Sequence, residues 1–375
     1  MNPGAGHDMK FVDRLKMELP QGPTTVRRHR ATVDQRRHAP PNQDRQPGLH
    51  CDPPAHVIHP DAISATSARN EDLVRGVVPN GGLWRGLRLI TVCLPPLLVG
   101  VTMWTCWKGW FSPVDLMLFA VFYVISALGI TVGFHRHFTH QSFRTKRWIS
   151  WILGVMGSMA LQGPLIWWVS THRAHHQHAD DTKDPHSPHI DDARGLWGRL
   201  RGFVHAHIGW TFKANLQDMS VHAKDLLADP LCRQIHAWFP FWVIMGLLLP
   251  ALIGGVIAGS WWGAASGFLW GGAVRLFMVH HVTWSVNSVC HLWGFRDYES
   301  PDQSRNNPVV GVLAMGEGWH NNHHAFPYSA RHGLEWWQFD PSWFLIRGLA
   351  AFGLATHLRT VPAERRRALR RRTLD

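Results

Sequence analysis

Cysteine is scarce in this chain of 375 residues: there are five, and no two of them form a Cys-x-x-Cys pair. This pattern argues against a thiolate metal site, an iron–sulfur cluster and a disulfide framework, and it is compatible with a reducing compartment. Acidic residues are also few, since 26 Asp and Glu stand against 38 Lys and Arg and leave a formal net charge of +12. The chain is therefore basic and lacks the cysteine spacing of the common thiolate sites.

Aromatic residues are missing from the two most basic runs, residues 24–45 and 364–372. These runs therefore disfavour nucleic acid as a partner and favour an anionic lipid surface or an acidic protein, with a solvated flexible tail as the simpler alternative. Residues 1–82, rich in Pro and Arg and without apolar periodicity, are predicted to be a disordered N-terminal region. Residues 356–375 are predicted to be a basic C-terminal tail.

Charge is nearly absent from four long stretches of the chain. Uncharged runs of 19 residues follow Arg88 and Asp115, and each is about as long as a bilayer core is thick. A further uncharged run, residues 237–274, together with the residues after it, fits a hairpin of two spans. The sequence therefore predicts an all-α integral membrane protein, a bundle of four transmembrane helices at about 88–108, 115–135, 237–258 and 261–282.

The basic residues predict how this bundle is oriented. The two short loops on one side carry a single basic residue, Lys108, whereas nearly every other Lys and Arg lies on the side of the two tails. The positive-inside rule then places both termini in the cytoplasm. Residues 148–171 are also long and uncharged, but a single crossing there would separate two groups of histidines by a bilayer. With its internal glycines and Pro164, this stretch is predicted to be an interfacial segment, either amphipathic or re-entrant.

Histidine, by contrast, is abundant and clustered. Four groups follow one another along the chain: His135 and His140; His172, His175 and His176; Asn287 and His291; and His320, His323 and His324. The two triplets are spaced i, i+3, i+4, which puts three imidazole rings on one face of a helix. The first pair lies five residues apart, about 140 degrees round an ideal helix, so it needs a helix end or a bulge in order to converge.

Nine imidazoles and one carboxamide are more than a single four-coordinate zinc can use, but they suit two metal ions of higher coordination number. Imidazole donors are compatible with iron, copper or zinc, and the residues alone leave that choice open. All four groups fall on the cytoplasmic side of the predicted bundle. We therefore expect a cytosolic helical cap that holds a di-metal histidine site.

The stretches GFHRHFTHQSF, THRAHHQHADDTKDPHSP, NSVCHLWG and GEGWHNNHHAFP resemble the histidine boxes of the membrane-bound fatty-acid desaturase family. The four residues between His135 and His140 match the delta-9 acyl-CoA (stearoyl-CoA) desaturase type. The stretch GPLIWWVSTHRAHHQH looks closer to the bacterial members of that type. The resemblance covers residues 83–355, the predicted desaturase domain. It implies a four-helix membrane bundle in which two Fe2+ ions and O2 insert a cis-delta-9 double bond into a saturated acyl chain of about 16 to 18 carbons.

The resemblance also implies which residues hold each iron. One iron would be held by His135, His140, His172, His176 and His323, and the other by His175, His291, His320 and His324, with Asn287 acting through a water. Carboxylates that orient the rings are expected from Asp180, Asp184 and Glu317. The nearby His178, His186 and His189 are alternative supporting residues, and Trp168 is a candidate for substrate binding.

One departure from the resemblance concerns the acyl carrier. Animal acyl-CoA enzymes of this type carry Arg-Asp before the second box, whereas this chain has Ser170 and Thr171. The carrier is therefore open between CoA, acyl carrier protein and an intact lipid. The short, cysteine-free C-terminal tail predicts that electrons come from a separate protein, a ferredoxin or a cytochrome b5-like donor with its reductase.

Two other functions remain open on the sequence alone. A membrane hydroxylase with the same histidine boxes would return oxygen to an alkyl or acyl chain. A membrane metal carrier is the second alternative, although carriers usually place their ionisable ligands within the spans. In this chain the histidines lie beyond the span ends, which favours an enzyme.

Overall fold

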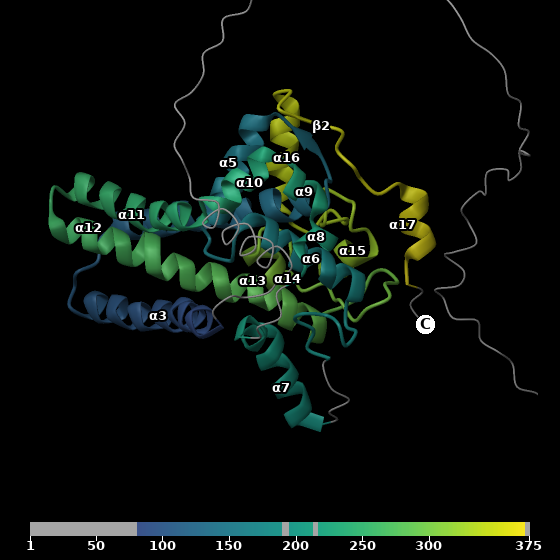
Figure 1. Ribbon diagram of the computed structural model, residues 1–375, viewed down its shortest axis with the longest axis horizontal. Coiled ribbons are helices and arrows are strands. Elements are labelled where there is room, and N and C mark those ends of the chain that lie inside the picture. Colours follow the sequence, from purple (N-terminus) through teal and green to yellow (C-terminus); the bar gives the residue numbers. More distant parts are fainter. Residues whose placement is uncertain (1–80, 190–194, 213–216, 372–375) are drawn as a thin grey trace, which may run out of the picture. The chain divides into compact units, whose positions relative to one another are not determined.

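The computed structural model describes residues 81–189, 195–212 and 217–371, and it folds them almost entirely into helices (Figure 1). The predicted N-terminal region 1–82 thus lies almost wholly outside the described residues. The first half contains α3 (Gly81–Trp107), α4 (Pro113–Leu128), the π-helix η1 (Gly129–Thr139), β1 (Arg144–Thr145), α5 (Arg147–Ser158), α6 (Leu165–His178), α7 (Gly195–His207) and the 3-10 helix η2 (Gly209–Phe212).

The second half begins with three short helices and ends with a helix beyond a short strand. Its elements are α8 (Met219–His222), α9 (Lys224–Ala228), α10 (Pro230–Ala237), α11 (Phe239–Ala258), α12 (Trp261–Gly267), the π-helix η3 (Phe268–Val274), α13 (Arg275–Leu292), α14 (Pro308–Leu313), α15 (His320–Ala325), α16 (Pro341–Ala351), β2 (Ala355–Thr356) and α17 (Ala363–Leu369).

Within the described part of the chain, three helical segments are long and apolar enough to cross a membrane: Gly86–Trp107, Pro113–Thr139 and Phe239–Ala258. They coincide with the first three of the four predicted spans. The fourth predicted span is helical throughout but consists of α12, η3 and the start of α13. It packs against α11 at glycines; a side chain on Gly254, for example, would lie 2.4 Å from the carbonyl oxygen of Gly263. Such close contact fits a helical hairpin.

Residues 148–171 do not form one helix. α5 ends at Ser158, α6 begins at Leu165, and the turn between them contains Gly163 at a φ of +104°. With twelve residues, α5 is shorter than the roughly 20 that a crossing requires. In Figure 1 it stands across the direction of α13, as does α16. Both ends of the 148–171 stretch can therefore remain on one side of a membrane, as the positions of the histidines require.

The first histidine pair lies on a π-helix. The backbone N–H of His140 donates to the carbonyl of His135, five residues earlier, at 3.1 Å, and the two ring centroids lie 4.8 Å apart. The expected distortion of the helix is thus present, and it brings the two rings together. The π-helix also packs closely on α5, since a Cβ at Gly129 would lie 2.3 Å from the backbone nitrogen of Gly157.

A fully buried arginine joins three of these helices. Arg275 donates to the carbonyl oxygens of Gly271 at 3.0 Å, Met159 at 2.6 Å and Gly246 at 2.5 Å. These carbonyls belong to η3, to the end of α5 and to α11. A guanidinium inside a membrane domain is costly unless its N–H groups are satisfied, and here backbone oxygens satisfy them. Arg275 therefore fixes α5 and α11 against the fourth helical segment.

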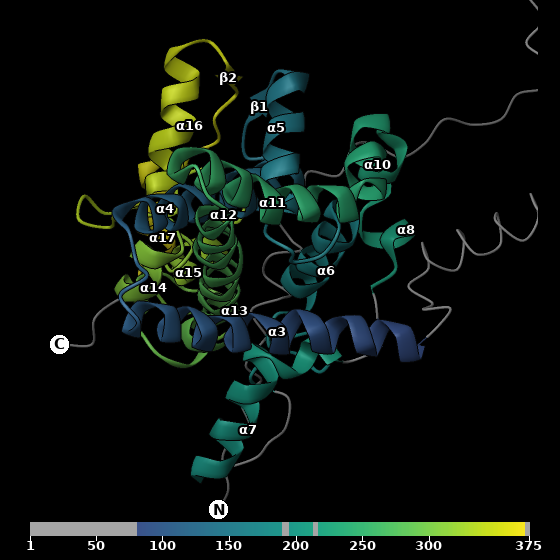
Figure 2. The same ribbon diagram turned by 90° about the vertical axis from the view of Figure 1, so that its left-hand side faces the viewer.

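The chain after α16 packs back onto the first half of the protein. β2 pairs antiparallel with β1, with Arg144 opposite Thr356, and Figure 2 shows this pair between α5 and α16. The backbone N–H of Arg359 donates to Ser142 at 2.9 Å, and that of Arg371 donates to Asp297 at 2.9 Å. The described part of the predicted basic tail is therefore tied to the helical domain by its backbone.

The close contact at Gly129 predicts a specific sensitivity. Gly129→Ala places a methyl group against the backbone of α5 and is expected to cost about 1–3 kcal/mol of stability, the usual range for overpacking. Gly100→Ala in α3 is the matched control, because a Cβ there meets nothing within 4 Å. Thermal unfolding of the detergent-purified variants measures the difference. Equal midpoints for the two variants would contradict the contact.

Candidate metal centre

The structure gathers the nine boxed histidines into two groups, in each of which the ligand nitrogens all lie within 4.8 Å of one another. One group contains His135, His140, His172, His176 and His323, and the other contains His175, His291, His320 and His324. These are the two sets that the resemblance implies. The rings come from η1 and the residue after it, from α6, from the end of α13 and from α15.

Within each group the rings turn their Nε2 atoms toward one another. In the first group, Nε2 of His323 lies 3.1 Å from that of His135 and 2.9 Å from that of His176. In the second group, the Nε2 atoms of His291 and His320 lie 3.0 Å apart. Each group thus encloses a point that several nitrogens face, which is the arrangement of a metal site.

Buried carboxylates hold the other nitrogen of four of these rings. The Nδ1 atoms lie 2.6–2.9 Å from carboxylate oxygens, in the pairs His135 with Glu317, His175 with Asp184, His291 with Asp180, and His324 with Asp302. A carboxylate accepts a hydrogen bond, so it places the ring proton on Nδ1 and leaves a lone pair on Nε2. Each carboxylate therefore fixes both the tautomer and the orientation of its ring.

The pair His175 and His324 tests whether these groups suit a metal. Both Nδ1 atoms are bound to carboxylates, and the two Nε2 atoms lie 3.4 Å apart. In neutral rings with this tautomer, the two lone pairs face each other and repel. A cation between them turns the repulsion into coordination, and the four buried carboxylates would balance two divalent ions. The residues present therefore fit two bound metal ions.

The electrostatics keep several of the donors in the form that binds metal. Burial and then the neighbouring imidazoles lower the pKa of His176, His320 and His323 well below the usual histidine value, so these rings are neutral at physiological pH. For Asp184 and Asp302, burial alone would raise the carboxyl pKa, but His175 and His324 outweigh burial and the net pKa lies below the usual value. Neutral imidazole backed by an ionised carboxylate is the usual form of a histidine ligand.

Further charged residues orient Glu317. The buried Arg136 lies 3.4 Å from Glu317 and 3.0 Å from Asp340. His332 approaches the same Glu317 carboxylate at 3.3 Å, and its ring centroid lies 4.5 Å from that of His323. Burial alone would raise the pKa of Glu317, but His135, His332 and Arg136 outweigh burial, so the net pKa lies well below the usual value and the carboxylate stays ionised.

The other residues singled out from the sequence lie at different distances from the two groups. The ring centroid of His186 lies 4.3 Å from that of His175. Nε2 of His189 lies 3.2 Å from the His291 carbonyl oxygen, to which its N–H can donate. His178 ends α6 and belongs to neither group. Asn287 is half-buried on α13, one turn before His291.

Trp168 and the two residues before the second box define the surroundings of α6. The indole of Trp168 stacks on His172, with ring centroids 5.1 Å apart and an angle of 18° between the planes. Ser170 and Thr171 are both buried, and the Ser170 hydroxyl donates to the carbonyl of Asp218 at 3.3 Å. These two side chains therefore cannot contact a carrier in solution in the way that exposed charged residues could.

Three supporting residues were missed in the sequence: Asp302, Arg136 and His332. Asp302 lies in the loop between α13 and α14, outside all four boxes, and only the fold brings it to His324. Arg136 is inside the first box, but the sequence does not distinguish a buried arginine at that position from an exposed one. The only available signal was the acidic character of the stretch DYESPDQS, which follows the third box.

Comparison with known proteins agrees with this geometry. Residues 108–359, about two thirds of the chain, match the family model described as fatty acid desaturase. The chain belongs to the fatty acid desaturase family. This assignment rests on a region that contains all nine gathered histidines.

Three relatives illustrate the range within the family. The hex-5-enoyl-[acyl-carrier protein] acetylenase of Moorena producens is 43% identical over 244 residues, 65% of this chain and 76% of the relative. The sn-1 stearoyl-lipid 9-desaturase of Anabaena variabilis is 42% identical over 242 residues, 64% of this chain and 81% of the relative. The acyl-CoA C20 Delta5-desaturase of Anemone leveillei is 37% identical over 283 residues, 74% of this chain and 80% of the relative. Their names cover three carriers and more than one bond position.

Asp302 supplies a test of the centre. Asp302→Asn removes the negative charge behind His324 and is expected to weaken metal binding by roughly 10–100-fold, the usual effect of losing such a partner. Metal retained by the purified protein after dialysis against graded chelator measures the effect. Asp181→Asn is the control, because Asp181 is exposed and, among the described residues, its carboxylate accepts hydrogen bonds only from the neighbouring Thr182. Equal metal retention in the two variants would exclude a supporting role for Asp302.

Proposed function

We propose that this protein desaturates a saturated fatty acyl chain with O2, using two iron ions held by the two histidine groups. The observation that carries the proposal is the convergence of nine buried or half-buried imidazoles in a chain of the fatty acid desaturase family. Five histidines would hold one iron and four the other, with Asn287 completing the second set through a water. Iron would supply the oxidising chemistry that removal of hydrogen from an unactivated methylene demands.

The protein's own residues would prepare the site for this chemistry. The carboxylates of Glu317, Asp180, Asp184 and Asp302 hold their rings in one tautomer, so the donor nitrogens need no rearrangement when metal binds. The buried rings keep bulk water away from the reacting position, which limits wasteful reduction of O2. Trp168, stacked on His172, would border the acyl chain.

The substrate would be an acyl chain of about 16 to 18 carbons, desaturated at the delta-9 position. The Anabaena relative, whose name states a stearoyl-lipid 9-desaturase, supports this choice. The buried Ser170 and Thr171 give no exposed charge that would favour CoA, so a lipid carrier is the preferred reading, with CoA and acyl carrier protein as outcomes of the product analysis.

The chain would lie in the membrane as a bundle of four helices with a helical cap. The fourth crossing would run through α12, η3 and the start of α13, where Arg275 is satisfied by backbone carbonyls. Both termini and the histidine groups would face the cytoplasm, as the distribution of Lys and Arg indicates. Electrons would come from a separate ferredoxin or cytochrome b5-like protein with its reductase, drawn to the basic chain by charge.

Heterologous expression tests the reaction. In a host without its own desaturase, the wild-type chain is expected to yield monounsaturated fatty acids two hydrogens lighter than their precursors. His320→Ala removes a donor from the second group and is expected to abolish the product, whereas His178→Ala, outside both groups, should retain it. Gas chromatography with mass spectrometry of the total lipids measures product mass and bond position. Products that gain an oxygen would instead identify a hydroxylase, and unchanged lipids with folded, iron-loaded protein would refute the proposal.

Metal analysis tests the cofactor separately. Protein purified without chelator is expected to contain two iron ions per chain, because two groups of histidines with four buried carboxylates suit two divalent ions. Inductively coupled plasma mass spectrometry on detergent-purified protein gives the ratio, and iron in His320→Ala should fall while protein yield is unchanged. Stoichiometric zinc without oxygen consumption would point to the metal carrier.

A further inference from the structure

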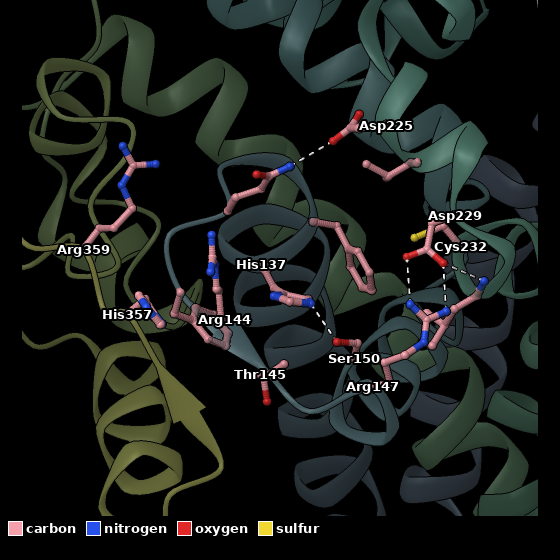
Figure 3. Close-up of a pocket in the computed structure, with 15 residues that line it drawn as sticks. His137, Arg144, Thr145, Arg147, Ser150, Asp225, Asp229, Cys232, His357 and Arg359 are labelled. Carbon is pink, nitrogen blue, oxygen red and sulfur yellow. Dashed lines mark hydrogen bonds and ion pairs between the residues drawn. The ribbon is translucent and has the colours of Figure 1, made fainter. Parts of the chain in front are cut away.

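A separate cavity lies beside the first histidine box. It has a volume of about 680 Å³ and is lined by the loop after η1, by the first turns of α5, by α9 and α10, and by the segment after β2 (Figure 3). Its polar walls carry Arg144, Arg147, His357 and Arg359. None of these residues belongs to the two metal groups.

Backbone pairing builds the cationic wall. Because Arg144 pairs with Thr356, His357 and Arg359 follow directly beside it, and Figure 3 shows Arg144 between His357 and His137. The hydroxyl of Thr145 donates to the Leu354 carbonyl at 2.6 Å, and the Arg359 N–H donates to Ser142. His357 adopts a φ of +52°, a left-handed conformation that few residues other than glycine adopt and that the surrounding pairing maintains. The wall is therefore fixed before any ligand arrives.

The acidic residues of the cavity do not neutralise this wall. Asp225 pairs with Arg173 at 2.6 Å, and Asp229 pairs with Arg147 at 2.9 Å. By contrast, Arg144 and Arg359 form no ion pair with any described residue; the guanidinium of Arg359 lies only over the ring of Tyr328, at 5.3 Å. On the cavity floor, Nε2 of His137 lies 2.9 Å from the Ser150 hydroxyl. Both arginines are exposed, so their guanidinium N–H donors remain accessible to an anion at the cavity mouth.

The same helix that borders the cavity also presents an apolar face. On α5, Trp148 is 55% exposed and Ile152 40% exposed, and the ring of Trp151 lies 5.5 Å from that of Trp242, near the start of the spanning helix α11. Exposed Trp and Ile at the level where a span begins are typical of a helix lying in the membrane interface. With α5 in that interface, the cavity beside its first turns would lie close to the lipid phosphates.

We propose that this cavity binds the phosphate group of an anionic phospholipid, with Arg144 and Arg359 as its principal donors and the apolar face of α5 directed into the bilayer. The charge is complementary, since two unpaired cations meet an anionic headgroup. Binding there would hold the cap against an anionic membrane surface. The inference rests on the membrane placement given under the proposed function, but it concerns residues that take no part in the metal groups.

The test compares lipid binding by full-length, detergent-purified protein. Native mass spectrometry counts dioctanoyl phosphatidylglycerol bound per chain, with dioctanoyl phosphatidylcholine as the zwitterionic counterpart of zero net charge and inorganic phosphate as a competitor. Wild type is expected to bind phosphatidylglycerol more tightly than phosphatidylcholine. The double variant Arg144→Gln, Arg359→Gln is expected to bind phosphatidylglycerol roughly tenfold more weakly or worse.

The matched control is Arg365→Gln, Arg367→Gln, which removes two exposed arginines from α17 and changes the net charge equally. This control should bind phosphatidylglycerol like wild type. Equal weakening in both double variants would mean that only net charge matters and would overturn the site. Full competition by inorganic phosphate at matched concentration would overturn the lipid as ligand. Iron content and product formation, measured in the same preparations, should be unchanged in both double variants. Wild-type protein without iron or without product would count against the proposed function and not against this site.

Discussion

Imidazole lone pairs that point at one another repel, and this repulsion is the constraint around which the domain is organised. Rings in both groups face one another across about 3 Å, so cations at the two centres and anions behind the rings would relieve the repulsion. The carboxylates of Glu317, Asp180, Asp184 and Asp302 supply the anions at the Nδ1 atoms. They come from segments far apart in the chain, and the fold must bring all of them to one place.

The membrane part of the chain supplies that convergence. Because α5 ends before α6 begins, the chain turns between them at residues 159–164, and the second box meets the first. Arg275 bonds the end of α5 to α11 and to η3 through three carbonyls. An unpaired charge inside a membrane domain would be destabilising. The Arg275 guanidinium is instead hydrogen-bonded to backbone carbonyls and so holds together the helices that carry the site.

The fold and the donors were largely predictable, because their causes are local. Spacing of i, i+3, i+4 places rings on one helix face whatever the tertiary structure, and uncharged runs report membrane spans by length alone. The five-residue spacing of His135 and His140 even required the distortion that η1 provides. The supporting residues could not be predicted, because Asp302 reaches His324 only through the loop after α13, and nothing in its own neighbourhood marks it. The basic cavity depends on the pairing of two-residue strands, which are too short to leave a periodic signal.

The π-helix η1 ties the spacing of the first box to the backbone beneath it. An α-helical residue turns the chain by about 100°, so deleting one residue between His135 and His140 would rotate Phe138 and everything after it relative to the span. The ring of His140 would leave its centre, whereas Gly129 and Gly133, which precede the deletion, would keep their close contacts with α5. The spacing of the first box and the type of helix that carries it therefore depend on each other. A relative with a shorter first box would need a different helix in place of η1 as well.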